Sequence, residues 1–295
     1  MELVLTTVAP SGAASFSIGY ADAFQGLDVQ ILDSVMLSPT ASDLVFEAAD
    51  LTAVRQALGR AFAEAPIDWC VQPVEGRRKR LLVADMDSTI INVECLDELA
   101  DFAGKKAEIA AITERAMRGE LEFEGALRER VGMLKGLSTT ALQQAYDERV
   151  RLNPGARTLV RTMAENGARC VLVSGGFTFF TSRVAEAAGF HADRANTLLE
   201  EAGALSGRVG EPILGREAKL AALKEEAAAL GAPLSQTLAI GDGANDLAMI
   251  EAAGLGVAYR AKPIVAAQAD AKVDHADLTA LLYFQGYQAS DFVTD

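Results

Sequence analysis

Two carboxylates placed two residues apart, Asp85 and Asp87, directly follow the apolar run at residues 81–84. Such a run is typical of a strand that is buried on both faces of a parallel sheet. Alternate residues of an extended chain point the same way, so both carboxylates should lie at the carboxyl edge of the sheet, where open α/β folds bind ligands. Two like charges this close are costly unless a cation lies between them, and carboxylate oxygens suit Mg²⁺. On its own, the pair also fits an ordinary polar loop.

Two more apolar stretches end in polar turns that contain glycine. Residues 168–173 lead into the turn SGG at 174–176, and residues 237–240 lead into GDGAND at 241–246. Between them, Lys219 stands near the start of an alanine-rich helical stretch. Because parallel strands share one carboxyl edge, we expect these turns to converge on a single site.

The converging residue types suit a phosphate group and a metal ion. Ser174 offers a hydroxyl, Gly175 lets backbone N–H groups approach a phosphate closely, and Lys219 can neutralise phosphate charge. Asp242 adds a third carboxylate for Mg²⁺, and Asp246 can support the metal from nearby. Each feature alone is common, because such turns are frequent and a helical lysine is usually exposed. Their occurrence together, in this order, favours an enzyme that handles phosphate.

The elements that position these residues predict an α/β domain over residues 80–295. From Arg80 onward, strands alternate with helical stretches, as in a doubly wound parallel sheet. The segment 95–153 is too long for one crossover helix, and its apolar periodicity indicates four helices inserted after the first strand. We expect these helices to form a lid above the site.

Residues 1–75 are predicted to form a separate small α+β domain. Strands are expected at 2–8, 29–37, 44–48 and 68–72, and helices at 13–24 and 51–63. The resulting order β-α-β-β-α-β is ferredoxin-like and resembles the ACT-type regulatory domain in its element order.

Composition excludes several classes of function. The chain has 295 residues, of which 50% are hydrophobic and 23% charged, and its net charge of −14 argues against nucleic-acid binding and against an anionic membrane surface. No apolar run approaches the length of a membrane span. Three cysteines without metal-type spacing favour a reducing, cytoplasmic setting, and two histidines leave little material for zinc or Ser-His chemistry. The sequence leaves open whether the chain forms a homo-oligomer.

The set DMDST, VSGG, Lys219 and GDGAND resembles the haloacid dehalogenase (HAD) superfamily of aspartate-based phosphohydrolases. Within it, the lid stretch from Glu94 through RAMRGELEFEGALRERV is similar to that of the phosphoserine phosphatases. The resemblance covers about residues 80–285. It implies a HAD-like Rossmannoid core with an inserted helical cap, Mg²⁺ as the cofactor and O-phospho-L-serine as the small-molecule substrate. The implied reaction releases L-serine and phosphate, as the last step of serine biosynthesis.

The same resemblance implies a role for each matching residue. Asp85 is the nucleophile that forms an aspartyl-phosphate, and Asp87 is first the general acid and then the general base. Side chains of Asp85 and Asp242 and the backbone carbonyl of Asp87 hold the metal, with Asp246 behind them. Substrate contacts are implied for eight residues: Glu94, Met117, Phe123, Arg130, Ser174, Gly175, Lys219 and Asn245.

Phosphoserine adds an ammonium and a carboxylate to its phosphate, and each is costly to bury unpaired. Glu94 suits the ammonium, and Arg130 on the third lid helix suits the carboxylate through two-pronged hydrogen bonds. Met117 and Phe123 would close the pocket over the short side chain. Without the resemblance, Glu94 and Arg130 also fit solvated helix residues.

Two other functions fit part of the pattern. A phospho-accepting receiver domain also uses Asp, Mg²⁺, a hydroxyl residue and Lys, but it lacks the second Asp of a DxD pair and needs no helical lid. A phosphotransferase on the same fold, passing phosphate to a small alcohol such as homoserine, would use the same aspartyl-phosphate. The sequence separates a phosphatase from such a phosphotransferase poorly, and the two differ in how much free phosphate they release when acceptor alcohols are present.

Overall fold

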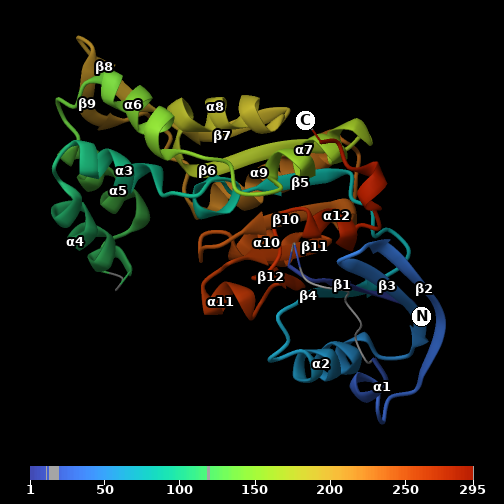
Figure 1. Ribbon diagram of the computed structural model, residues 1–295. Helices are drawn as coiled ribbons and strands as arrows, with labels where there is room; N and C mark the ends of the chain where they lie inside the picture. Colours follow the sequence, from blue (N-terminus) through green and yellow to red (C-terminus); the bar gives the residue numbers. More distant parts are fainter. Residues whose placement is uncertain (11, 13–19, 118–119, 295) are drawn as a thin grey trace.

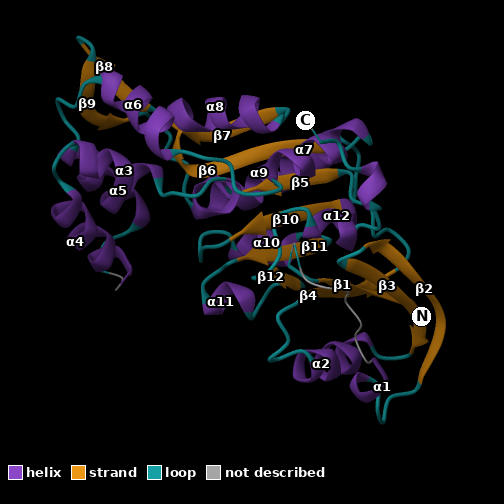
Figure 2. Ribbon diagram, viewed as in Figure 1, coloured by secondary structure: helices purple, strands orange, loops and turns teal. Residues whose placement is uncertain are grey.

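The computed structural model spans residues 1–295 and describes all of them except 11, 13–19, 118–119 and 295 (Figure 1). The described residues form one large sheet in the strand order β2-β3-β1-β4-β12-β11-β10-β5-β6-β7, and a separate hairpin, β8-β9. Figure 2 shows α3–α6 and the hairpin at one end of the molecule, and α1, α2 and the N-terminal strands at the other. None of the described helices has the length and the apolar composition that a membrane-spanning segment needs.

The strands are β1 (Glu2–Val8), β2 (Val29–Ser38), β3 (Ala41–Ala48), β4 (Asp68–Pro73), β5 (Leu81–Ala84), β6 (Arg169–Phe177), β7 (Ala192–Asn196), β8 (Leu198–Glu201), β9 (Ala204–Val209), β10 (Thr237–Gly241), β11 (Leu255–Tyr259) and β12 (Ala271–Val273). The helices are α1 (Tyr20–Ala23), α2 (Leu51–Ala61), α3 (Cys95–Phe102), α4 (Lys106–Met117), α5 (Phe123–Met133), α6 (Thr139–Arg149), α7 (Ala156–Glu165), α8 (Thr178–Ala188), α9 (Arg216–Ala229), α10 (Leu247–Ala252), α11 (Pro263–Ala266) and α12 (Ala280–Phe284).

The parallel part of the sheet runs from β12 through β11, β10, β5 and β6 to β7. All four residues of β5 are buried, and its side chains alternate between two cores. Leu82 and Ala84 pack in the core that includes α7 and α12, whereas Leu81 and Val83 pack in the core that includes α9 and α10. Helices therefore cover both faces, and the predicted α/β class with a doubly wound parallel core is confirmed.

The four helices α3–α6 lie between β5 and β6, where the sequence predicts the inserted lid. Their apolar faces join the main core through residues such as Leu99, Leu127 and Leu142. Ser138 caps α6 by accepting a hydrogen bond from the backbone N–H of Thr140 at 3.2 Å. Backbone hydrogen bonds between residues 136–139 and the β8-β9 hairpin then tie this hairpin to the lid.

Two predicted regions need comment. The helix expected at 13–24 lies partly outside the described residues. Within the described part of this range, Tyr20–Ala23 are helical. The SGG turn at 174–176 continues strand β6 instead of following it. Helix α8 and strand β7, which come next, were not among the predicted elements.

The N-terminal strands continue the parallel sheet. Strand order β2-β3-β1-β4 is antiparallel throughout, and Trp69 of β4 pairs with Lys272 of β12. The buried carboxylate of Asp68 accepts hydrogen bonds from the backbone N–H groups of residues 274–276, at 2.6–3.2 Å. Gln72 Nε2 donates to the carbonyl of Phe284 at 2.7 Å. Residues 1–75 and the rest of the chain thus share buried polar contacts as well as one sheet.

These contacts lead to a prediction about residues 1–75. A chain that begins at Glu75 should keep the activity that the sequence motifs predict, because no described residue of the removed segment lines the cavity described below. It should unfold at a lower temperature, since Val8, Leu37, Ala41 and Cys70 pack in the main core and would be lost. Asp68→Ala in the full chain is the milder comparison. It leaves buried N–H groups unpaired, which should lower the free energy of unfolding by about 1–3 kcal/mol. It should leave kcat/KM unchanged. Loss of activity in a folded, shortened chain would contradict the prediction.

Candidate active site

The loop after β5 reverses the chain in a strained turn. Asp85 is still extended, with φ −70° and ψ 156°, whereas Ser88 has φ 56°, in the left-handed region that residues other than glycine rarely adopt. The Ile91 N–H donates to the Met86 carbonyl at 3.0 Å and closes the turn. Ser88 Oγ donates to Glu94 Oε1 at 2.6 Å, which links the loop to the start of α3. The strain therefore accompanies a turn that brings Asp85, Ser88 and Glu94 to one cavity.

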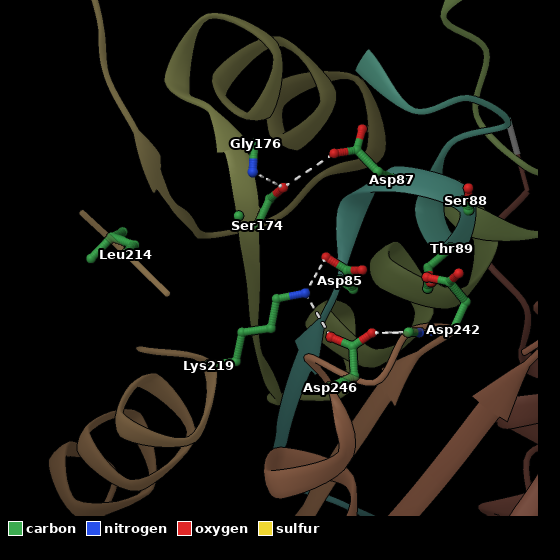
Figure 3. Close-up of polar contacts among 12 residues, drawn as sticks. Asp85, Asp87, Ser88, Thr89, Ser174, Gly176, Leu214, Lys219, Asp242 and Asp246 are labelled. Atoms are coloured by element: carbon green, nitrogen blue, oxygen red, sulfur yellow. Dashed lines mark hydrogen bonds and ion pairs between the residues drawn. The ribbon is translucent and has the colours of Figure 1, made fainter. Parts of the chain in front are cut away.

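A buried lysine joins two carboxylates at the floor of the site. Lys219 Nζ lies 2.6 Å from Asp85 Oδ1 and 2.6 Å from Asp246 Oδ1 (Figure 3). Asp246 is fully buried, and its Oδ2 accepts hydrogen bonds from the N–H groups of Asp242 at 3.2 Å and Gly243 at 3.0 Å. Asp246 thus fixes both Lys219 and the backbone of the turn that carries Asp242. A Cβ on Gly241 would lie 2.3 Å from Asp246 Cγ, so only glycine fits there.

Burial and the neighbouring charges shift the pKa values of Asp85 and Lys219. Burial, followed by the charge of Asp246, raises the pKa of Asp85 well above its usual value, and Lys219 acts against that rise. Burial alone would lower the pKa of Lys219, but Asp85 and Asp246 together raise it above its usual value. Lys219 is therefore a permanent cation beside Asp85.

Asp87 lies above Asp85, beside the SGG segment. Its Oδ2 is 3.5 Å from Ser174 Oγ (Figure 3). Its Oδ1 accepts a hydrogen bond from the Cys95 N–H at 3.2 Å. The Gly176 N–H donates to Ser174 Oγ at 2.8 Å. Burial, followed by the negative charge of Glu94, raises the pKa of Asp87 to about 7. A carboxyl group with such a pKa is suited to give and take a proton near neutral pH.

Three carboxylates could hold a cation. Oxygens of Asp85, Asp242 and Asp246 lie within 4.8 Å of one another. Burial, then the charge of Asp246, raises the pKa of Asp242 to about 6, as expected where negative charges are crowded. An all-oxygen set of carboxylates fits Mg²⁺ and not a metal that prefers sulfur or nitrogen. Because Asp246 already binds Lys219 and two backbone N–H groups, Asp85 and Asp242 are the more available ligands.

Above this floor lies a cavity of about 430 Å³ between the sheet edge and the lid. Predicted site residues that line it are Asp85, Asp87, Glu94, Phe123, Arg130, Ser174, Gly175, Asp242 and Asn245. Lys219 and Asp246 are not among its lining residues; Lys219 contacts Asp85, and Asp246 in turn contacts Lys219. The Met117 side chain lies outside the described residues, so its predicted contact remains a prediction.

Phe123 brings the lid against the core. A Cβ on Gly175 would lie 3.5 Å from Phe123 Cζ, and a Cβ on Gly215 would lie 3.5 Å from its Cδ1. The ring therefore packs over two glycines, one in the SGG segment and one just before α9. This contact closes one side of the cavity.

Arg130 and Glu94 lie on the lid side of the same cavity. Arg130 is half-buried, and its Nε donates to the Ala126 carbonyl at 3.3 Å. Among the described residues it makes no ion pair with any carboxylate. Burial lowers the pKa of Arg130, while the charges of Asp97 and then Glu94 oppose that shift. A partly dehydrated cation without an ion-pair partner is thus available to an anion in the cavity.

Comparison with known proteins identifies the family. The family model for haloacid dehalogenase-like hydrolases matches residues 82–251, a span that contains Asp85, Ser174, Lys219 and Asp242. The chain belongs to the haloacid dehalogenase-like hydrolase family. It is 49% identical over 208 residues to a phosphoserine phosphatase of Polaromonas sp., covering 69% of this chain and 88% of the relative.

Two further relatives extend the match within this family. A phosphoserine phosphatase of Streptomyces coelicolor is 43% identical over 263 residues, covering 87% of this chain and 64% of that longer protein. The unliganded structure of a probable phosphoserine phosphatase from Vibrio cholerae has a TM-score of 0.77 at 29% identity, covering 98% of this chain and 88% of that one. The chain is accordingly a HAD-family phosphatase, a phosphoric monoester hydrolase.

Several cavity residues of this HAD-family chain were not predicted from its sequence. They include Leu96, Asp97, Thr113, Leu127, Phe177 and Lys262. Asp97 lies in the first turn of α3, whose N-cap is Glu94, so its closeness in sequence to a predicted site residue was a detectable signal. Lys262 had none, because its approach to the site depends on how the loop after β11 folds back.

Proposed function

We propose that this chain is a Mg²⁺-dependent phosphoserine phosphatase that hydrolyses O-phospho-L-serine to L-serine and phosphate through an aspartyl-phosphate on Asp85. The observation that carries the proposal is that one cavity holds both residues suited to phosphate chemistry and a pair of charged residues suited to an amino acid. The floor offers Asp85 beside Lys219, and the lid side offers Arg130 and Glu94. The relatives named phosphoserine phosphatase support the same substrate.

The first half-reaction forms the covalent intermediate. Asp85 Oδ attacks phosphorus, the bond from phosphorus to the serine oxygen breaks, and the departing alkoxide takes a proton from Asp87. The proton matters because an alkoxide is a poor leaving group. The raised pKa of Asp87, about 7, keeps a proton available for this step. Lys219 and backbone N–H groups near Ser174 neutralise charge on the remaining phosphate oxygens.

The second half-reaction releases phosphate. Asp87, now ionised, takes a proton from a water molecule, and that water attacks the phosphorus of the aspartyl-phosphate. The bond from phosphorus to Asp85 breaks, which restores the carboxylate and its ion pair with Lys219. The two steps together must lower the barrier of a very slow hydrolysis by roughly 20 kcal/mol.

The side chains of Asp85 and Asp242 and the carbonyl of Asp87 would hold the Mg²⁺ ion, with Asp246 behind them. When bound, the ion supplies positive charge for the phosphate oxygens and relieves the repulsion among these carboxylates. The residues present fit this ion because all of the donor atoms are oxygens.

Substrate identity is proposed to come from the lid side. The carboxylate of phosphoserine pairs with Arg130, and its ammonium pairs with Glu94, whose Oε1 is held by Ser88 Oγ at 2.6 Å. Phe123 closes the cavity over the short side chain and excludes water. In metabolism, the product would be L-serine, which places the enzyme at the last step of serine biosynthesis.

The test is release of free phosphate from O-phospho-L-serine with Mg²⁺, measured with and without added small alcohols such as homoserine. We expect phosphate and serine in equal amounts, with little effect of the alcohols. Phosphate transfer to the alcohol at the expense of free phosphate would favour the phosphotransferase. Absence of phosphoserine turnover, with turnover of another phosphate ester, would overturn the substrate assignment.

The metal assignment gives a further prediction. Chelation should abolish turnover, Mg²⁺ should restore it, and Ca²⁺ should compete and inhibit, because Ca²⁺ takes more ligands and a looser geometry. Asp242→Asn should raise the Mg²⁺ concentration needed for half-maximal rate by at least about tenfold, since it removes one charged ligand. Rates measured over a range of both ions provide the check. Comparable turnover with Mg²⁺ and Ca²⁺ would count against this site.

A further inference from the structure

Lys262 lies on the cavity wall although it belongs to none of the motifs discussed above. It follows β11, whose carboxyl end lies at the same sheet edge as those of β5, β6 and β10. Between the strand and Lys262, Arg260 adopts φ 44°, in the left-handed region, and this bend turns the chain. The Lys262 N–H then donates to the Asp242 carbonyl at 3.1 Å. The loop is therefore fastened to the metal-binding turn.

The side chain of Lys262 is exposed and has no ion-pair partner among the described residues. It differs in this respect from Lys219, which is buried between two carboxylates. It also differs from Lys272, which pairs with Asp274 at 3.2 Å. The ammonium of Lys262 thus lies at the rim of the cavity without an ion pair to any residue that the structure describes.

The charges around the cavity make such a cation useful. Of the residues that the structure describes, five carboxylates line its walls, those of Asp85, Asp87, Glu94, Asp97 and Asp242, against two cations, Arg130 and Lys262. The whole chain has a net charge of −14. An incoming phosphate monoester is itself a dianion near neutral pH, so it meets repulsion on approach. Arg130 lies on lid helix α5, so among the described lining residues Lys262 is the cation on the core side of the rim.

We propose that Lys262 captures the phosphate dianion of the substrate at the cavity entrance and guides it toward Asp85. This role rests on the proposed phosphatase reaction but not on serine as the leaving alcohol, because Lys262 would recognise the phosphate alone. A compact, exposed ammonium attracts any phosphate ester as a point charge. Since Lys262 lies outside the ion-paired floor, its effect falls on encounter and binding and not on bond breaking.

Lys262→Gln tests the proposal in the full chain with Mg²⁺. It should lower kcat/KM about threefold to tenfold at low salt for both phosphoserine and para-nitrophenyl phosphate, with kcat within about twofold of the parent. The ratio between parent and variant should shrink toward one as ionic strength rises from about 0.01 M to about 1 M, because the Debye length falls from about 30 Å to about 3 Å. The inhibition constant of inorganic phosphate should rise in parallel.

Two further variants make the comparison specific. Lys262→Arg keeps the charge and should restore most of kcat/KM. Lys224→Gln removes the same charge from an exposed position on α9 that does not line the cavity, and it should behave like the parent. If Lys262→Gln matches Lys224→Gln at every salt concentration, Lys262 is only a solvated surface residue and the proposal fails. A fall in kcat that salt does not change would also overturn it, since that would place Lys262 in the chemical step.

The two proposals fail in different ways. If phosphoserine is not hydrolysed, the substrate assignment falls, but turnover of para-nitrophenyl phosphate and inhibition by inorganic phosphate still report on Lys262. If phosphoserine is hydrolysed and these readouts do not respond to Lys262→Gln, only the capture role is lost.

Discussion

Asp85→Asn is expected to lower phosphoserine turnover by roughly 10⁴-fold or more while the chain stays folded. A carboxamide oxygen is a far weaker nucleophile than a carboxylate, so the aspartyl-phosphate cannot form. Asparagine has nearly the same size and fits a position that is only 5% exposed. Burial raises the pKa of Asp85, which means that its charge is costly there, so removing it should not unfold the protein. Lys219 keeps its contact with Asp246 in the variant.

The measurement combines steady-state kcat, thermal unfolding and mass spectrometry of acid-quenched protein incubated with substrate. The parent should show a phosphate adduct on the peptide that contains Asp85, and the variant should show none. Asp87→Asn is the matched control, because it makes the same change two residues away. It keeps the nucleophile, and its kcat should fall about 10²–10⁴-fold because both proton transfers become slower. Parental activity in Asp85→Asn, or an adduct that persists in it, would refute the covalent mechanism.

Local sequence patterns predicted the core of this fold because its strands are short, apolar and followed by diagnostic turns. Strand β5 occupies residues 81–84 as expected, since each of its side chains is buried and neither face needs a polar residue. The lid helices also lie where apolar periodicity placed them. Helix α8 was missed, although Phe180, Val184 and Ala188 repeat every four residues and are buried, because it follows β6 without a turn.

Contacts between distant segments were beyond the reach of sequence patterns. The pairing of Trp69 with Lys272 joins residues about two hundred positions apart, and no periodicity indicates it. The same holds for Lys262, whose place on the cavity wall depends on the positive φ of Arg260 and on a hydrogen bond to the Asp242 carbonyl. Motif residues could be predicted because strand ends of a parallel sheet share an edge, whereas these contacts depend on how complete loops pack.

Arg130→Ala should weaken phosphoserine turnover at least tenfold in kcat/KM and spare para-nitrophenyl phosphate, which has no carboxylate. Arg130 is half-buried in the cavity wall and makes no ion pair with any described residue, so under the proposed function it would pair with the substrate carboxylate. Losing one partner of a buried charge contact typically costs about 2–5 kcal/mol. Arg130→Lys should recover only part of the loss, because an ammonium cannot make the two parallel hydrogen bonds of a guanidinium.

Arg128→Ala provides the matched control for this prediction. Arg128 lies on the same helix, but its side chain is exposed and pairs with Glu124 at 3.2 Å and with Glu211 at 2.8 Å, away from the cavity wall. Its removal should leave kcat/KM for both substrates unchanged, because exposed ion pairs contribute little to stability. If Arg130→Ala instead lowers kcat/KM equally for both substrates, Arg130 stabilises the lid or binds the phosphate and does not bind the serine carboxylate. The assignment of phosphoserine as the substrate would then lose its main physical support. The proposed phosphatase chemistry of Asp85 and Lys219 would stand, because neither side chain is proposed to contact any part of the substrate except the phosphate.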